Sequence, residues 1–344
     1  MAYTTINKPG LHFNTKLYAG NSSTQSISGV GFQPDWVWIK DRDNASRWHQ
    51  LFDAVRGAGK VLYSNDAAQQ GTDNTRLSGF ASDGFSLGNS ANVNNNGNNY
   101  ASWNWKANGA GSSNSDGDIT STVSVNTTSG FSIVKYTGTG ANATIGHGLG
   151  VAPKMIIVKA YEGGQQWAVQ HSALGATKGL RINTNAAAYT SSTRWNNTEP
   201  TSSVFTVGTE AEVNTNTEDH IAYCFAEKTG FSKFGSFIGN GYANGTFVYT
   251  GFKPAFVINK RTDSTANWLL IDNKREGFNP DQDDLRPNLP NAEGSDETFD
   301  FLSNGFKVRT TSNDFGGGSG ATYIFMAFAE EPLVGTNNVP ATAR

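Results

Sequence analysis

The residue types best suited to binding chemistry are tryptophans that crowd the N-terminal part of the chain: Trp36, Trp38, Trp48, Trp103 and Trp105. On a strand, residues two apart share a face, so Trp36 and Trp38 point the same way, as do Trp103 and Trp105. Flat indole faces can stack on sugar rings while neighbouring polar groups bond to the hydroxyls. Packing between two sheets explains the same spacing, and this core role is the interpretation we prefer.

A polar loop in the middle of the chain holds a second aromatic set, Tyr189, Arg194 and Trp195. A core does not require large aromatic side chains in a loop, and binding residues are frequent in loops. We therefore expect Tyr189, Arg194 and Trp195 to be the ligand-binding residues, with a sugar as the ligand.

Catalytic chemistry has a weaker signal. Asp53 and Asp272 are candidates for the paired carboxylates of a glycosidase, which must converge across a cleft at about 5–9.5 Å. The middle of the chain has Gln170 in the corresponding region. Such variation indicates polar groups in hairpins or interfaces.

Metal and cofactor chemistry also lack a convincing pattern. The acidic run Asp281-Gln282-Asp283-Asp284 could offer oxygen ligands to calcium, but it lacks the glycine and the closing glutamate of an EF-hand loop, so we expect a solvated loop. The histidines show no pair at metal-ligand spacing, and no Gly-x-Ser-x-Gly nucleophile motif is present. The sequence predicts a protein that is not an enzyme, with no catalytic residues, no metal and no cofactor.

A repeated pattern shows which elements must position these residues. In each copy Gly stands three residues before Pro, Lys stands six after it, and Trp follows eight residues beyond the Lys. Such self-similarity is typical of an array of diverged structural units. The copies span residues 31–40, 150–159 and 251–260, and the tryptophans are Trp48, Trp167 and Trp268.

The composition favours an all-β fold. Hydrophobic residues make up 37 % and charged residues 16 % of the 344 residues, and 39 glycines with many Asn, Ser and Thr supply turns and strands. We predict three tandem β-sandwich modules, of jelly-roll or concanavalin-like type. Their expected bounds are a lead-in at 1–12, module one at 13–107, a Gly/Ser/Asn linker at 108–129, module two at 130–228, module three at 229–331 and a tail at 332–344.

Each module is expected to contain the same strands in the same order. An opening strand with alternating polarity precedes a central strand that is apolar on both faces, and an aromatic strand closes the unit. The long linker predicts that modules two and three pack as a pair, with module one placed more independently. The closing strands are expected at 100–105, 220–225 and 323–328.

Charge and segment patterns exclude several partners. The formal net charge of −3 provides no basic surplus for nucleic-acid binding. The single cysteine, Cys224, lies in an apolar run and is expected in the core. We find neither a secretory signal nor an apolar run long enough for a transmembrane helix, so membrane insertion is not expected.

Several runs together resemble a family of uncharacterised structural proteins of tailed bacteriophages, especially marine phages. The likeness covers nearly the whole chain and brings no catalytic residues with it. The runs are 33–40, 100–107, 224–228, 231–234, 251–257, 261–263, 300–307 and 327–330.

The resemblance implies a virion component, tail-fibre or tail-associated, with lectin-like β modules. It would be assembled in the host cytoplasm and exposed on the released particle, with other virion proteins as partners, a homo-oligomeric state and a host-surface glycan or receptor as ligand. A purely architectural tail adaptor or capsid decoration protein is the alternative, and a glycan-degrading tailspike is the lesser one.

Overall fold

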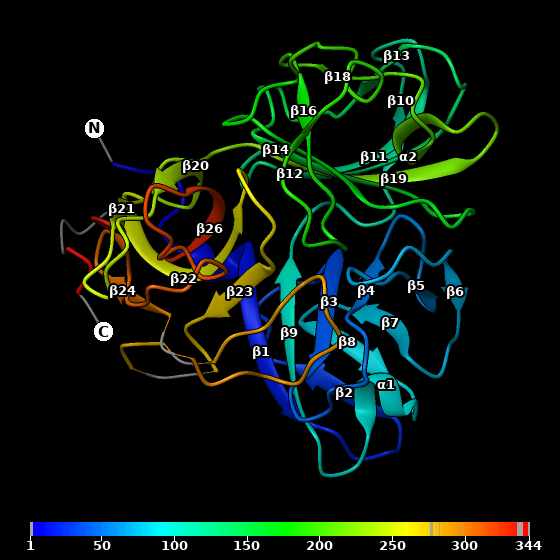
Figure 1. The fold of residues 1–344 in the computed structure, drawn as a ribbon. Helices are drawn as coiled ribbons and strands as arrows, with labels where there is room; N and C mark the ends of the chain where they lie inside the picture. The colour runs from blue at the N-terminus through cyan, green and yellow to red at the C-terminus, as the bar shows by residue number, and fades with distance from the viewer. Residues whose placement is uncertain (1–2, 276–277, 282, 297, 336–339, 343–344) are drawn as a thin grey trace.

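The computed structural model describes residues 3–275, 278–281, 283–296, 298–335 and 340–342. It shows an all-β protein of antiparallel sheets, as predicted (Figure 1). The paired strands fall into three groups that are continuous in sequence, 13–105, 112–225 and 232–332, which we call units one, two and three. Within the described part of the chain, no helix has the length and apolar character needed to cross a bilayer.

Unit one has a main sheet with the strand order β1-β9-β3-β4 and a smaller sheet with the order β2-β8-β7. The short strands β5 and β6 form a separate pair, and a short 3₁₀ helix precedes β1. The elements are Pro9–Leu11, β1 (Phe13–Ala19), β2 (Gln25–Ser28), β3 (Trp36–Asp41), β4 (Gln50–Asp53), β5 (Lys60–Val61), β6 (Gly71–Thr72), β7 (Leu77–Ala81), β8 (Gly84–Leu87), α1 (Ala91–Asn94) and β9 (Asn99–Trp105).

Unit two has the longer main sheet, with the order β10-β11-β12-β19-β14-β15. The pairs β13-β18 and β16-β17 stand apart from it. Its elements are β10 (Ser112–Asn114), β11 (Ser121–Asn126), β12 (Phe131–Thr137), β13 (Ala143–Gly146), β14 (Met155–Ala160), β15 (Ala168–His171), β16 (Lys178–Gly179), β17 (Tyr189–Thr190), β18 (Val204–Val207), α2 (Ala211–Asn214) and β19 (Asp219–Phe225). The stretch 108–129, predicted as a linker, therefore carries β10 and β11, which extend this sheet.

Unit three has a main sheet with the order β20-β26-β22-β23 and a smaller sheet with the order β21-β25-β24. Its strands are β20 (Ser232–Ile238), β21 (Phe247–Tyr249), β22 (Phe252–Arg261), β23 (Trp268–Asp272), β24 (Phe299–Leu302), β25 (Gly305–Val308) and β26 (Thr322–Pro332). The closing strand of every unit, β9, β19 or β26, lies in the interior of its main sheet, beside the central strand β3, β14 or β22.

The repeated motif leads into these central strands. Its glycine has a positive φ in all three copies, 92° at Gly31, 73° at Gly150 and 81° at Gly251. This region is open to glycine and costly for other residues, which explains why the residue recurs. Every residue of β3 and β14 is buried, as the apolar character of both strand faces predicts.

The two faces of each central strand pack into different hydrophobic cores. In β3, Val37 and Ile39 pack with Ile27 and Phe85 of the smaller sheet of unit one. The alternate residues, including Trp36, point the other way, into a large cluster that contains residues of all three units. Units two and three divide their central strands in the same manner.

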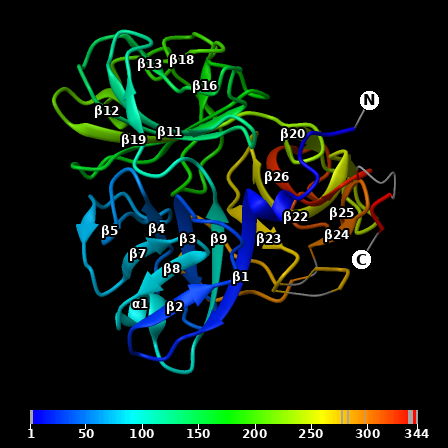
Figure 2. The ribbon, with the colours of Figure 1, turned by 180° about the vertical axis from the view of Figure 1, so that it is seen from behind.

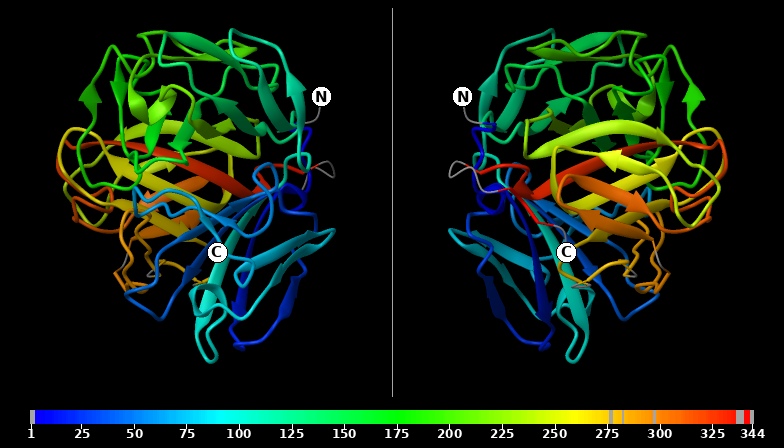
Figure 3. Two further views of the ribbon diagram at one scale, coloured as in Figure 1. Left: turned by 90° about the vertical axis from the view of Figure 1, so that its right-hand side faces the viewer. Right: turned by 90° about the vertical axis from the view of Figure 1, so that its left-hand side faces the viewer.

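The three main sheets thus meet around one shared core. The three units surround a common centre in Figure 1 and in the view from behind, Figure 2. Figure 3 shows unit two above and unit one below from both sides. Units one and two, two and three, and three and one are all in contact through this core. The expectation that module one is placed more independently is therefore wrong.

Candidate functional site

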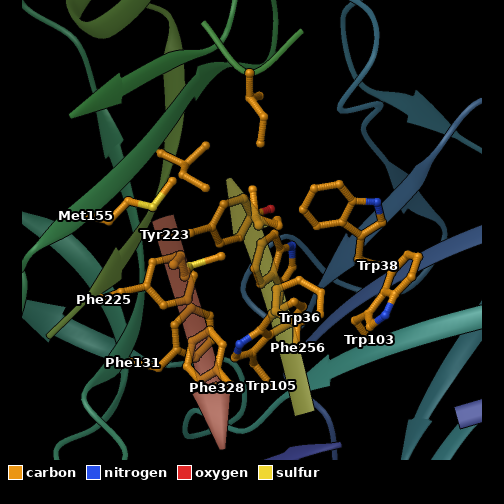
Figure 4. Packing of buried hydrophobic residues seen from close by; sticks show 14 of the residues in the cluster. Trp36, Trp38, Trp103, Trp105, Phe131, Met155, Tyr223, Phe225, Phe256 and Phe328 are labelled. Carbon is orange, nitrogen blue, oxygen red and sulfur yellow. The ribbon is translucent and has the colours of Figure 1, made fainter. Parts of the chain in front are cut away.

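Trp36 lies in the middle of the shared core, where aromatic rings from the three main sheets pack together (Figure 4). Each junction has edge-to-face or stacked contacts between rings, which are favourable geometries for aromatic pairs. Centroid distances across the junctions are 4.3 Å for Trp36–Tyr223, 5.6 Å for Trp105–Phe256 and 6.0 Å for Phe225–Phe328. The predicted core role of Trp36, Trp38, Trp103 and Trp105 is confirmed, since all four are buried.

Hydrogen bonds from ring N–H groups join the three units in a cycle. In each case the ring lies at the first residue of the second hairpin strand of one unit or directly before it, and the acceptor is a carbonyl in a loop of another unit. We call each such junction a seam. The bonds are Trp167 Nε1 to Tyr63 O (2.9 Å), Trp268 Nε1 to Arg181 O (3.0 Å) and His49 Nε2 to Arg286 O (3.1 Å).

His49 therefore occupies the place of Trp167 and Trp268, although the sequence pattern assigned that place to Trp48. Trp38 donates its indole N–H to His49 Nδ1 at 2.8 Å, so the proton of the neutral His49 lies on Nε2, which donates to the seam carbonyl. Burial lowers the pKa of His49 well below its ordinary value, which keeps the ring neutral.

Backbone bonds repeat the same cycle. After the seam carbonyl, the loop of each unit runs on and donates an N–H to a carbonyl at the hairpin of the next unit. The three bonds are Gln70 N to Tyr161 O (2.7 Å), Ala188 N to Thr262 O (2.9 Å) and Glu293 N to Arg42 O (2.8 Å). Buried backbone groups are thus paired between units as they are within sheets.

The repeated lysines support these hairpins. Lys40, Lys159 and Lys260 are buried, and burial lowers the pKa of each to about 8. Lys159 Nζ donates to Gln165 O at 2.6 Å within its own hairpin and to Ala67 O of unit one at 3.1 Å. The lysine that recurs in the motif is a structural residue that binds hairpin carbonyls.

Asp53 and Asp272, the carboxylates considered for glycoside hydrolysis, are buried at the seams. Asp272 Oδ2 accepts bonds from Arg275 Nε at 2.7 Å and from Trp103 Nε1 of unit one at 2.9 Å. Burial acts to raise the pKa of Asp272, but Arg275 and the indole N–H hold it below its ordinary value. Asp53 accepts in the same way from Arg56 at 2.5 Å and from Tyr223 of unit two at 2.8 Å.

The equivalent of these aspartates in unit two is His171 rather than Gln170. His171 pairs with Met155 in the ladder, as Asp53 pairs with Trp36 and Asp272 with Phe256. Its Nε2 bonds to the carbonyl of Phe325 in unit three at 3.1 Å. The interpretation of these positions as interface polar groups is confirmed.

Two of the three residues predicted to bind a ligand are not exposed. Arg194 and Trp195, predicted together with Tyr189, are fully buried within unit two. Arg194 Nη2 bonds to Glu210 Oε1 at 2.7 Å and pairs with Glu212. The ring of Tyr189 lies between two guanidinium groups, 4.8 Å from Arg194 Cζ and 5.0 Å from that of Arg181. The three residues have structural contacts here, and ligand binding by them stays a prediction.

The acidic run of unit three is not the solvated loop that was expected. Asp281 and Asp284 are buried, while Gln282 lies outside the described residues. Asp283 pairs with Arg42 of unit one at 3.2 Å, so the loop contributes to a seam. Among the residues that the structure describes, no group of three or more His, Cys, Asp or Glu side chains could hold a metal ion.

Trp48 is the one tryptophan of the described chain outside these cores, with 37 % of its surface exposed. Its ring meets Tyr63 edge to face, with centroids 4.9 Å apart and planes at 75°. Arg76 Nη1 donates to the Tyr63 hydroxyl at 2.9 Å and to Gln50 Oε1 at 2.5 Å. Ser46, Trp48, Gln50, Tyr63, Arg76 and Asn92 line a surface hollow of about 210 Å³.

A family model described as a domain of unknown function, DUF7483, matches residues 8–332. The chain belongs to this family. Because the match spans all three units, the DUF7483 domain corresponds to the closed set of three and not to one repeat. No curated protein matches the chain.

The sequence pattern of this DUF7483 domain does not reveal the hollow. Trp48, Trp167 and Trp268 stand at the same distance from their lysines, so the pattern treats the three as equivalent. Counting back from the aspartates gives a different alignment: Trp268 lies four residues before Asp272, and His49 lies four before Asp53. That count was available in the sequence, and it places one extra residue in the hairpin of unit one. The signal for the hollow is therefore the mismatch between the two counts.

Proposed function

We propose that the protein is a bacteriophage virion structural protein, tail-fibre or tail-associated, that binds a host-surface glycan or receptor without catalysis. The observation that carries the non-catalytic part is the burial of Asp53 and Asp272 in ion pairs at the seams. The resemblance to phage structural proteins supports the virion setting, and lectin-like β-sandwich units would suit a binding role. A rigid shared core also favours binding, because a preorganised surface loses little conformational freedom when a ligand binds.

Binding of the fluorescently labelled protein to intact cells of candidate hosts tests this function. Saturable binding that free host polysaccharide removes by competition is the expected result. Heat-denatured protein with the same label serves as the control for adhesion of exposed apolar surface. No saturable binding to any host, with a folded β-rich sample, would contradict the proposal.

A purely architectural role is the second candidate, favoured by an apolar patch on unit three. The exposed side chains are Ile238 at the end of β20, Tyr242 in the loop that follows, and Phe247 and Tyr249 on β21. Phe247 and Tyr249 share one face of β21, and β21 is an edge strand of its sheet. Large exposed apolar side chains on neighbouring elements are typical of surfaces that contact other proteins.

Light scattering at micromolar concentration tests association through this patch. A homo-oligomer that becomes monomeric when Phe247 and Tyr249 are both replaced by Ser would support the architectural role. A wild-type monomer would count against homo-oligomerisation and leave other virion proteins as the partners of the patch.

A further inference from the structure

We propose that the hollow beside Trp48 is the binding subsite for one neutral pyranose ring of a surface glycan. This inference rests on the proposed function and names the place where it is performed. It is carried by a difference between the three units at equivalent positions, by the exposure of one indole and by the polar groups that surround it.

The equivalent place in unit two contains an additional aromatic ring. Tyr63 corresponds to Arg181, because the carbonyls of both accept a seam hydrogen bond from a tryptophan ring. Arg76 corresponds to Arg194, because the carbonyls of both accept a bond from the glycine directly after β8 or β18, at 2.8 and 2.7 Å. In unit two the ring of Tyr189 lies against the guanidinium groups of both Arg181 and Arg194. In unit one Arg76 instead bonds directly to the Tyr63 hydroxyl, at 2.9 Å.

In unit three, the residue before the seam ring forms hydrogen bonds within its own unit. Asn267 precedes Trp268, and its amide bonds to Asp314 at 2.8 Å and accepts from Asn288 at 2.8 Å. Trp48, which precedes His49, has no comparable side-chain hydrogen bonds, because its indole N–H bonds to no described residue. With one extra residue in its hairpin, unit one has His49 at the seam and Trp48 at the surface.

The exposed indole is arranged for stacking. Its contact with Tyr63 is edge to face, at 75°, so the two rings are not stacked and Tyr63 meets at most one of the two indole faces. Gln50 Nε2 donates to the carbonyl of Trp48 at 3.0 Å, and Arg47 Nη1 donates to Asn92 Oδ1 at 3.1 Å. These bonds hold the lining side chains in place before a ligand arrives, which lowers the entropic cost of binding.

The chemistry of the lining selects the ligand class. A flat apolar ring with amide, hydroxyl and guanidinium groups beside it suits a ligand with one apolar face and a rim of hydroxyls. At about 210 Å³ the hollow is smaller than the ~300–1,000 Å³ of pockets for drug-sized ligands, so it fits a single ring. Arg76 is paired with Asp73 at 3.0 Å, so its charge is balanced and a neutral sugar is favoured over an anionic one.

NMR of the full chain tests the subsite, with the methyl glycosides of glucose, galactose, mannose and N-acetylglucosamine as probes. The other seven tryptophans are buried, so the Trp48 indole N–H resonance reports on the hollow alone. We expect at least one glycoside to shift this resonance saturably and to protect Trp48 from quenching by acrylamide. Failure of all four glycosides and of free host polysaccharide to affect Trp48 would overturn the inference.

Variants separate this inference from the proposed function. Trp48→Ala should weaken glycoside binding at least about tenfold, as expected for loss of an aromatic anchor, and Trp48→Phe should restore part of it. Tyr242→Ala, which removes another exposed aromatic ring on unit three, is the matched control and should bind like the wild type. Circular dichroism checks that each variant is folded.

The two assays fail in different ways. If the wild type binds cells and Trp48→Ala binds them equally well, the subsite is wrong and the proposed function stands. If the wild type binds no cells but a glycoside still shifts the Trp48 resonance, the proposed function is wrong and the subsite stands. Loss of both cell and glycoside binding in Trp48→Ala supports both.

Discussion

Asp53 illustrates how a single side chain couples two units. It accepts bonds from Arg56 of its own unit and from Tyr223 of unit two, and all three side chains are buried. Replacing Asp53 by Asn would leave the guanidinium of Arg56 buried without its counter-charge. We expect the free energy of unfolding in urea to fall by about 3–5 kcal/mol.

The control for this change is Asp263→Asn, because Asp263 pairs with Arg261 at the surface and should lose at most about 1 kcal/mol. A glycan-degrading tailspike that used Asp53 would behave differently. It would give an Asp53→Asn variant that keeps its stability and loses the degradation of host polysaccharide.

The buried histidines make stability depend on pH. Burial lowers the pKa of His171 and of His220 to about 4, whereas the unfolded value is about 6.5. As the pH falls from about 6.5 towards 4, the unfolded chain takes up protons that the folded chain does not. The free energy of unfolding should therefore decrease over this range, by roughly 1–3 kcal/mol for each histidine.

Urea unfolding at a series of pH values measures this slope. In His171→Gln the amide can still donate to the carbonyl of Phe325 but does not titrate, so the slope should become shallower. An unchanged slope in this variant would show that His171 is not one of the groups responsible.

At the level of elements, the second hairpin strand of each unit is the part that reaches a neighbouring unit. Trp268→Phe keeps most of the packing but removes the N–H that binds the carbonyl of Arg181. The carbonyl keeps a longer bond from Thr184 N at 3.4 Å, so we expect the free energy of unfolding to fall by about 0.5–1.5 kcal/mol, the net contribution of one hydrogen bond, which chemical denaturation would detect. Trp48→Phe, at the surface, should change stability by no more than about 0.5 kcal/mol.

Most strands could be predicted from the sequence because their patterns are local. The central strands were recognised by apolar residues on both faces, and the closing strands by aromatic residues at matching offsets. Strand β10 could not be recognised in this way, because Ser112, Ser113 and Asn114 have no apolar pattern and are held by pairing with β11. The place of Trp48 depended on the length of one hairpin, which spacing alone does not fix.

At the level of the whole molecule, the shared core makes the units depend on one another. We expect a single cooperative unfolding transition, with coincident curves from far-ultraviolet circular dichroism and tryptophan fluorescence. Trp268→Phe lies at the seam of units two and three, and it should lower the midpoint for reporters in unit one as well. Separate transitions for the units would contradict this expectation.

The arrangement of the units was the part that sequence reasoning missed. The tryptophans of unit one read equally well as the core of one sandwich or as a junction, because a strand pattern shows which residues share a face and not what covers that face. Long-range pairs such as Trp103 with Asp272 have no signal in a single sequence. The burial of Trp36 and Trp38 was predictable, and their partners in other units were not.

The cycle of seams also bears on how such a chain can arise and change. Three identical copies of one unit, placed about a threefold axis, would make the same three contacts as a symmetric trimer. In a trimer of separate chains, every substitution appears at all three seams at once. With the copies fused into one chain, an extra residue in a single hairpin alters one seam and leaves two intact, so a new surface such as that of Trp48 can evolve while the parent architecture is retained.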